Sequence, residues 1–374
     1  MVIGATAFAA DMAAPNATRP RQLSPPCEAA YEGLGQKLPH AEMERLRSEL
    51  VKLKNGAVHD SRSRVHLLAL VVVSSNQLCL FENFVAQVSF NVFPDMLPVV
   101  AATLDAQSFD RCRALAQAPP TTLRTASLHT NSTAKLLFCA DLSTLHAPKA
   151  WSTESRVECN AEMWGSSAWK KPQILLALLE LLAAFAPSWK VAMMDLDAIV
   201  CKPGLHAFVA SLEDEGHEQL WMVRDREVWN NGDRSARRPN TGVVLASVSH
   251  AQFVEAWLGW AERVVRMFKL KDHMAISDQT GLHMMVGANP EHERVLQLFP
   301  DSVAALITSP ESSPVIRHYN PIGKYTPNNL CPPDVSKKSC SAGAQKVFAM
   351  ASDGRWGPPS PDCSYHRLLP SMRV

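Results

Sequence analysis

Residues 191–201, Val-Ala-Met-Met-Asp-Leu-Asp-Ala-Ile-Val-Cys, place two acidic side chains at the end of an apolar run. The run predicts a buried strand of a parallel sheet. Carboxylates at alternate positions of an extended chain lie on the same side, so we expect Asp195 and Asp197 to be close together. Buried like charges repel and need a cation, and a hard divalent ion with oxygen ligands is suitable. Alternatively, the two residues only begin a loop and cap a turn or a helix.

The composition is that of a globular protein. The chain has 374 residues, 47% of them hydrophobic and 20% charged, which suits one large α/β domain or two smaller ones. A formal net charge of +1 provides no global field for nucleic acid or an anionic membrane. No apolar run reaches the roughly 20 residues that span a bilayer. Residues 1–12 are apolar but lack a basic segment, so membrane association would depend on a weak or missing N-terminal anchor.

The cysteines bear on the cellular compartment. There are nine and no C-x-x-C pair, which argues against a zinc site. Cys331, Cys340 and Cys363 lie in a Pro-rich tail and are compatible with a disulfide in an oxidising lumen. Asn16 and Asn131 begin glycosylation sequons. These features favour the Golgi or another secretory-pathway lumen and leave the cytoplasm open.

Three regions follow from the pattern along the chain. Residues 1–60 are predicted to be a disordered tail followed by a helix over 41–54, which is either a stem or a helix packed on the main domain. Residues 61–330 form the main domain. Residues 331–374 form a Pro- and Cys-containing extension that we expect to wrap the surface.

The main domain begins with alternating elements. Strands are predicted over 65–73 and 97–104, and helices over 77–88 and 108–115. Strand, helix, strand and helix in this order predict a doubly wound parallel sheet.

The turn after the first strand has two interpretations. Ser74, Ser75 and Asn76 stand where nucleotides often bind in such sheets. The alternative is that Ser75 or Asn76 only caps the following helix.

Later segments lead toward and away from the acidic pair. A Leu-rich helix with Pro172 in its first turn is expected to end near residue 186 and to lead into the strand before Asp195. Residues 226–239 form an Arg-rich loop, long enough for a lid. A strand over 243–246 and an amphipathic helix over 250–268 follow.

Between about residues 65 and 330 the chain contains seven short motifs, in this order: Ser74-Ser75-Asn76, Asp105, Lys171-Pro172, Asp195-Leu196-Asp197, Asn240-Thr241-Gly242, Asp278-Gln279, and His318 with Gly323 and Lys324. The order resembles the nucleotide-diphospho-sugar transferase family, glycosyltransferases of GT-A fold similar to plant cell-wall arabinosyl- and xylosyltransferases (family GT77). The resemblance implies a mixed, mostly parallel sheet flanked by helices. Val200-Cys201-Lys202 departs from the family, which usually has an aromatic residue and an Arg there.

The resemblance also implies a metal site that binds Mn²⁺ or Mg²⁺. Asp197 is then a direct ligand, Asp195 contacts the metal or the ribose, and His318 completes the protein ligands. Lys324 becomes a phosphate contact, a task suited to a point charge.

Further residues acquire expected functions from the same resemblance. Asn240 and Asp278, with Gln279 beside it, would lie near the transferred sugar or the acceptor. Gly242 would allow the backbone to approach the ligand closely. Lys171 would reach the nucleotide, as would the turn at Ser74, Ser75 and Asn76.

The function implied is metal-dependent transfer of a sugar from a nucleotide-sugar, with a UDP-sugar favoured, to a glycan or glycoprotein acceptor with retention of configuration. One rival is a phosphohydrolase of the haloacid dehalogenase type, with Asp195 as nucleophile and Asp197 as acid and base. The other is a non-catalytic GT-A-like binding protein.

Overall fold

The computed structural model describes residues 37–57, 67–91, 97–117, 136–145, 160–214, 218–225, 238–267, 278–307, 309, 313–319 and 342–357. Its strands are β1 (Leu67–Val73), β2 (Val99–Thr103), β3 (Leu137–Asp141), β4 (Lys190–Met194), β5 (Ala198–Val200), β6 (Leu220–Asp225), β7 (Arg238–Ser247), β8 (Leu296–Leu298), β9 (Ala304–Leu306) and β10 (Ile316–His318). They form a seven-stranded sheet in the order β3-β2-β1-β4-β7-β6-β8 and a small sheet in the order β5-β10-β9.

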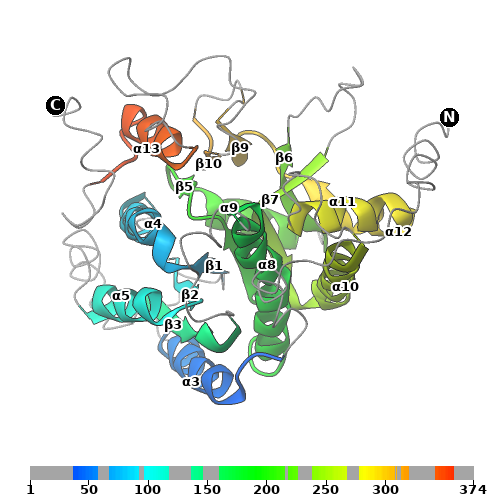
Figure 1. Cartoon of the computed structure of the whole chain (residues 1–374), viewed down its shortest axis with the longest axis horizontal. Helices are drawn as coiled ribbons and strands as arrows, with labels where there is room; N and C mark the ends of the chain where they lie inside the picture. The colour runs from blue at the N-terminus through cyan, green and yellow to red at the C-terminus, as the bar shows by residue number, and fades with distance from the viewer. Residues whose placement is uncertain are drawn as a thin grey trace.

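Strand directions confirm the predicted α/β class. In the large sheet, β7 runs antiparallel to its neighbours β4 and β6, and the other pairings are parallel. Helices flank this sheet on both sides (Figure 1). They are α3 (His40–Ala57), α4 (Leu78–Asn91), α5 (Ala106–Gln117), α8 (Asn160–Ala183), α9 (Leu205–Asp214), α10 (Ala251–Met267), α11 (Asp278–Ala288), α12 (Pro290–Val295) and α13 (Ala342–Ser352).

The central strand β1 shows why the sequence forms a sheet covered on both faces. Ala69 and Val71 pack in a core with residues of α4, α5 and α9. Leu68 and Leu70 face the opposite way, into a second core with residues of α3, α8 and α10. Because both faces are buried, the strand is a continuous apolar run without polar alternation.

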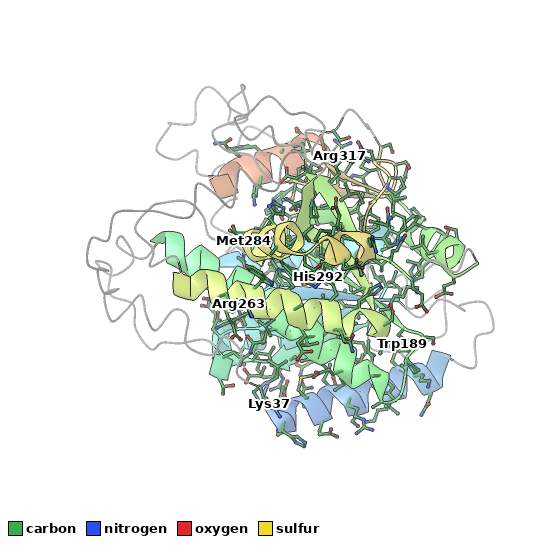
Figure 2. The ribbon with its side chains drawn as sticks, turned by 90° about the vertical axis from the view of Figure 1, so that its right-hand side faces the viewer. Lys37, Trp189, Arg263, Met284, His292 and Arg317 are labelled. Carbon is green, nitrogen blue, oxygen red and sulfur yellow. A yellow bond between two sulfur atoms is a disulfide. The ribbon has the colours of Figure 1, made fainter. Side chains whose placement is uncertain are left out.

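The second core is covered by a stack of helices. Figure 2 shows α11, α10, α8 and α3 at successive levels, with Met284, Arg263 and Lys37 labelled on or beside them. Neighbouring helices in this stack pack on one another. None of the described helices combines the length and the apolarity that crossing a membrane requires.

Two predicted helix boundaries were wrong. The helix α8 begins at Asn160, so Pro172 lies inside it and not in its first turn. A proline there removes one helical hydrogen bond, but the turns that follow are held by buried side chains such as Leu175 and Leu179. The helix α3 runs past its predicted end at residue 54 and continues through Gly56 to Ala57, although Gly56 is a poor helix former.

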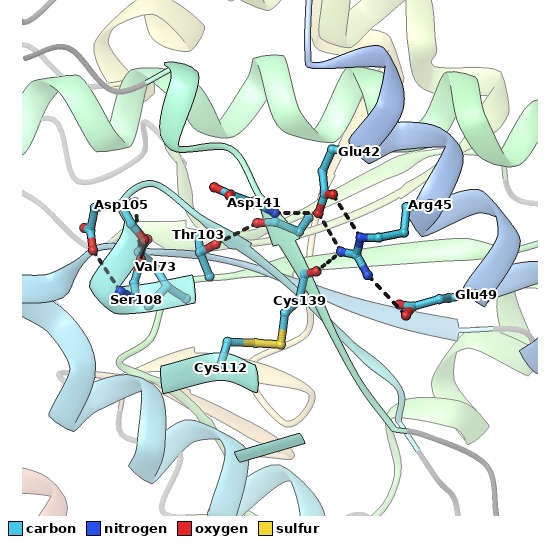
Figure 3. The surroundings of a disulfide bond; sticks show 11 residues. Glu42, Arg45, Glu49, Val73, Thr103, Asp105, Ser108, Cys112, Cys139 and Asp141 are labelled. Carbon is cyan, nitrogen blue, oxygen red and sulfur yellow. Dashed lines mark hydrogen bonds and ion pairs between the residues drawn. A yellow bond between two sulfur atoms is a disulfide. The ribbon is translucent and has the colours of Figure 1, made fainter. Parts of the chain in front are cut away.

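The helix α3 packs on the domain, which is one of the two alternatives for residues 41–54. Leu46 and Leu50 are buried. The Glu42 carboxylate accepts a 2.6 Å hydrogen bond from the backbone N–H of Asp141, and Arg45 donates to the carbonyl of Cys139 (Figure 3). The helix is therefore fastened to the backbone of β3.

A disulfide joins α5 to β3 between Cys112 and Cys139 (Figure 3). Their Cα atoms are 5.8 Å apart, although 27 residues separate them in the chain. Cys201 is the free, buried cysteine of the described residues. Other sequence features lie outside the part that the structure describes: both sequons, Cys331, Cys340, Cys363 and residues 226–237 of the Arg-rich loop.

Candidate metal centre

The acidic pair lies in a tight turn at the carboxyl end of β4. The strand ends at Met194, and the N–H of Ala198 donates to the carbonyl of Asp195 at 2.9 Å. The expectation that both carboxylates continue an extended strand was therefore wrong. They nevertheless converge, because the turn leads directly into β5 and the N–H of Asp195 is held by the carbonyl of Gly242 at 2.8 Å.

His318 reaches the turn from the small sheet. It is the last residue of β10, where it is paired with Ala198 at the start of β5. The N–H of Tyr319 donates to the carbonyl of Asp197 at 2.9 Å and fixes the two segments together. His318 Nε2 lies 3.5 Å from one oxygen of Asp195 and 3.4 Å from one oxygen of Asp197.

This geometry fits a divalent cation. One ligand atom from each of Asp195, Asp197 and His318 lies within 4.8 Å of the others. His318 has no exposed surface, and within the described structure neither of its ring nitrogens has a hydrogen-bond partner. A buried polar atom without a hydrogen bond is costly, and a metal ion between the three groups would be bound by Nε2, the nitrogen that faces both carboxylates. Two carboxylates and one imidazole suit Mn²⁺ and can also hold Mg²⁺.

Two lysines hold the outer oxygens of the acidic pair. Asp195 directs Oδ2 toward His318, and its Oδ1 lies 2.5 Å from Lys171 Nζ. Asp197 directs Oδ1 toward His318, and its Oδ2 lies 2.6 Å from Lys346 Nζ. In each carboxylate, therefore, one oxygen faces His318 and the other contacts a lysine ammonium group.

The pKa values follow from burial and these neighbours. Burial disfavours the carboxylate of Asp197, but Lys346 and His318 outweigh it and hold the pKa well below its ordinary value. The pKa of Asp195 is also lowered, since Lys171 outweighs its burial. Burial lowers the pKa of His318, yet the two carboxylates raise it to about 9 without a metal. A metal ligand must be a neutral imidazole, so metal and proton compete for Nε2.

Gly242 on β7 allows His318 to occupy its place. A Cβ at this position would lie 1.9 Å from Cε1 of His318 and 2.4 Å from Nε2. The sequence predicted a close approach of backbone to ligand, and the structure places the imidazole there. Asn240 accepts a 2.8 Å hydrogen bond from the N–H of Gly242 through its side-chain oxygen, so it supports this backbone.

Asp278 begins α11 beside the centre. It is 2% exposed, and its carboxylate lies 3.6 Å from Lys171 Nζ. Burial raises its pKa in spite of that lysine. Gln279 points elsewhere and donates to Asp225 at 2.9 Å. Asp278 is thus joined to the acidic pair through Lys171, whereas Gln279 is tied to the end of β6.

The turn after β1 contacts a different acid. The N–H of Ser75 donates to the Asp105 carboxylate at 2.7 Å, and the hydroxyl of Ser74 donates to the Asn76 side chain at 2.5 Å. Because β1 and β4 are neighbouring parallel strands, this turn lies at the same carboxyl end of the strands as the acidic pair. Nucleotide binding here stays a prediction, as it does for Lys324, which lies outside the described residues.

Lys346 is the site residue that sequence reasoning missed. It belongs to α13, in the segment predicted only to wrap the surface, and it is 8% exposed. Val347 to Met350, directly after it, are buried, and Ala349 and Met350 belong to the core shared with β1. The one available signal was a lysine in an otherwise small and apolar helix, which does not indicate an acidic partner.

Comparisons with known proteins give structural similarity only. No known family model matches the sequence, and no curated protein sequence matches. The chain is similar to the bifunctional glycosyltransferase WbbM, at 10% identity and a TM-score of 0.45, over 83% of this chain and about half (52%) of that one. It is similar to mouse xyloside xylosyltransferase 1, at 14% identity and a TM-score of 0.42, over 69% of this chain and 99% of that one. It is also similar to the galactosyltransferase LgtC, at 12% identity and a TM-score of 0.44, over 78% of this chain and 98% of that one.

Proposed function

We propose that this protein is a metal-dependent glycosyltransferase of GT-A type. The observation that carries the proposal is the convergence of Asp195, Asp197 and His318 at the carboxyl end of β4. In open α/β sheets this end of the strands is where ligands bind. The order of motifs along the sequence, which resembles nucleotide-diphospho-sugar transferases, supports the same assignment.

The substrate class follows from the chemistry of the centre. A bound Mn²⁺ or Mg²⁺ would neutralise negative charge on a diphosphate leaving group. Asp195, Asp197 and His318 would hold that ion, and Lys171 would orient Asp195. Asp278, which is buried beside Lys171, would hydrogen-bond a hydroxyl of the donor sugar or the acceptor.

We extend the proposal to a UDP-sugar donor, a glycan or glycoprotein acceptor, and retention of configuration, as the resemblance to family GT77 implies. In such a reaction the departing phosphate can accept the acceptor's proton, so the protein needs no separate base.

The direct test is a panel of nucleotide-sugars incubated with the protein, with and without Mn²⁺, while nucleoside diphosphate release is measured. We expect release from one donor class that depends on the metal and is abolished in Asp197→Ala. Release that is indifferent to both metal and Asp197 would contradict the proposal.

The two rivals give other outcomes in the same experiment. Phosphate release from a phosphomonoester would favour the haloacid dehalogenase reading, although that family has its acidic motif on the first strand of its core and here the motif follows β4. Metal-dependent binding of UDP without turnover of any donor would favour a non-catalytic binding protein.

We place the protein in the lumen of the secretory pathway. The disulfide between Cys112 and Cys139 supports this, because such bonds persist in oxidising compartments. The location is tested by thiol labelling of the denatured protein taken from its native source, which should leave Cys112 and Cys139 unlabelled until a reductant is added.

A further inference from the structure

Lys346 occupies a position that the proposed transfer reaction does not by itself require. Its ammonium group lies 2.6 Å from Asp197 Oδ2, on the side away from His318. Lys346 and Asp197 are separated by most of the C-terminal half of the chain, and both are nearly buried. A buried ammonium group costs free energy unless its charge is compensated.

The helix that carries Lys346 is built firmly into the domain. Asn83 on α4 donates to the carbonyl of Arg355 at 3.1 Å and accepts from the N–H of Gly357 at 2.9 Å. The Tyr319 hydroxyl, one residue after His318, donates to Asp353 at 2.8 Å. The metal-ligand strand and the end of α13 are therefore tied together, which fixes Lys346 over the site.

The charges around the centre are nearly balanced before any metal binds. Three carboxylates, from Asp195, Asp197 and Asp278, face two ammonium groups. With these groups ionised, a neutral imidazole and one bound divalent cation, the formal charge is +1. The metal-loaded centre would then carry an excess of positive charge, which a diphosphate would neutralise.

We propose that Lys346 is a positioning residue that makes metal binding and nucleotide binding depend on each other. Its charge opposes the metal when the metal binds alone and attracts the diphosphate when both ligands bind. Asp197 can contact both cations at once, because the oxygen that faces His318 is separate from the oxygen held by Lys346. This inference rests on the proposed function and assigns a coupling role to α13.

The test compares Lys346→Met with the wild-type chain in four equilibrium titrations. Mn²⁺ affinity is measured from the paramagnetic resonance signal of free Mn²⁺, with and without saturating UDP. UDP affinity is measured by calorimetry, with and without Mn²⁺. In Lys346→Met we expect Mn²⁺ alone to bind about fivefold more tightly, and UDP with Mn²⁺ about tenfold more weakly. UDP without Mn²⁺ should bind nearly as it does to the wild type, because no metal then holds the diphosphate beside Lys346. The coupling factor falls accordingly.

Three further variants separate charge from structure. Lys346→Arg keeps the charge and should restore most of the coupling. Lys346→Gln removes the charge with a different side chain and should behave as Lys346→Met does, so one poorly folding variant does not decide the result. Lys52→Met, at an exposed position of α3, changes the net charge equally and should alter no affinity.

Weaker binding of Mn²⁺ alone to Lys346→Met would overturn the inference, since Lys346 would then only orient Asp197. Unchanged coupling in Lys346→Met and Lys346→Gln would overturn it as well. If the wild-type chain binds UDP equally well with and without Mn²⁺, and Asp197→Ala makes no difference, the proposed function itself fails. The two failures are therefore distinguishable.

Discussion

Aspartates follow both β2 and β4, and they differ in what holds their oxygens. After β2, Asp105 accepts from the backbone N–H of Ser75 at 2.7 Å and of Ser108 at 2.8 Å. After β4, the acidic pair faces lysines and an imidazole that has no hydrogen-bond partner within the described residues. An aspartate at a strand end is thus structural when backbone donors occupy both its oxygens, and able to bind a cation when an oxygen is left for one.

Among the substitutions that test this comparison, Asp197→Ala should have the largest effect, a loss of Mn²⁺ affinity. The variant removes one of the three proposed metal ligands, so we expect Mn²⁺ affinity to fall more than about 100-fold, beyond the range seen for residues that only support ligands. Calorimetric titration measures the loss, and circular dichroism checks that the fold is kept. A variant that binds Mn²⁺ as the wild type does would show that both strand ends are merely structural.

Gly242→Ala should have the second-largest effect, on both stability and Mn²⁺ binding. The added Cβ would overlap the His318 ring, so either the backbone of β7 or the imidazole must move. We expect a loss of about 3 kcal/mol in the free energy of unfolding, together with weaker Mn²⁺ binding. Urea denaturation measures the first quantity and metal titration the second.

Gly259→Ala on α10 is the matched control for that substitution. A Cβ there meets no atom within 4 Å. Alanine favours a helix over glycine by about 1 kcal/mol, so this variant should be slightly more stable than wild type. Equal losses of stability in the two variants would contradict the close packing at Gly242.

A change of pH should have a smaller effect, with opposite signs for the stability of the metal-free protein and for its Mn²⁺ affinity. Without metal, the pKa of His318 is raised from 6.5 to about 9. The protonated imidazole therefore contributes stability that is fully present below pH 6.5 and is lost as the pH rises through 9. Metal binding expels this proton, so Mn²⁺ affinity should rise with pH, by up to about tenfold per unit below 9.

Titrations of the wild-type chain between pH 6 and 8 would measure this slope, with thermal denaturation of the metal-free protein in parallel. His318→Gln should flatten both profiles. An affinity that falls with rising pH would exclude His318 as a ligand.

Asp105→Ala should give the smallest effect and completes the comparison. It removes the acceptor for the N–H of Ser108 in the first turn of α5 and for the N–H of Ser75 in the turn after β1, so we expect a loss of about 1 kcal/mol in the free energy of unfolding. Mn²⁺ affinity should stay at the wild-type value. A clear loss of metal binding in this variant would mean that the centre extends to the end of β2.

What the sequence revealed was local. The apolar runs before Ser74, Asp105 and Asp195 predicted the strands along the chain, because hydrophobic pattern decides where a strand lies in the sequence. The tight turn at Asp195 was read as an extended strand, since a backbone turn of two or three residues leaves no periodic signal. His318 came only from resemblance to a family, because its strand pairs with β5 from more than 100 residues away.

Two further features had no local signature at all. The ion pair between Lys346 and Asp197 depends on how α13 docks, and a lysine in a helix is usually solvated. The disulfide between Cys112 and Cys139 joins elements whose contact is fixed only by the sheet order. Long-range contacts of this kind follow from the whole fold and not from any segment.

The contact between α3 and β3 has a consequence for handling the protein. The strand β3 is last in its sheet, and Glu42 and Arg45 occupy backbone groups along its outer side. An uncovered strand margin of this kind can recruit another chain and cause aggregation. A recombinant fragment that begins after residue 57 would lack this cover, so this shortening should lower the solubility of the protein even with the proposed metal ligands intact.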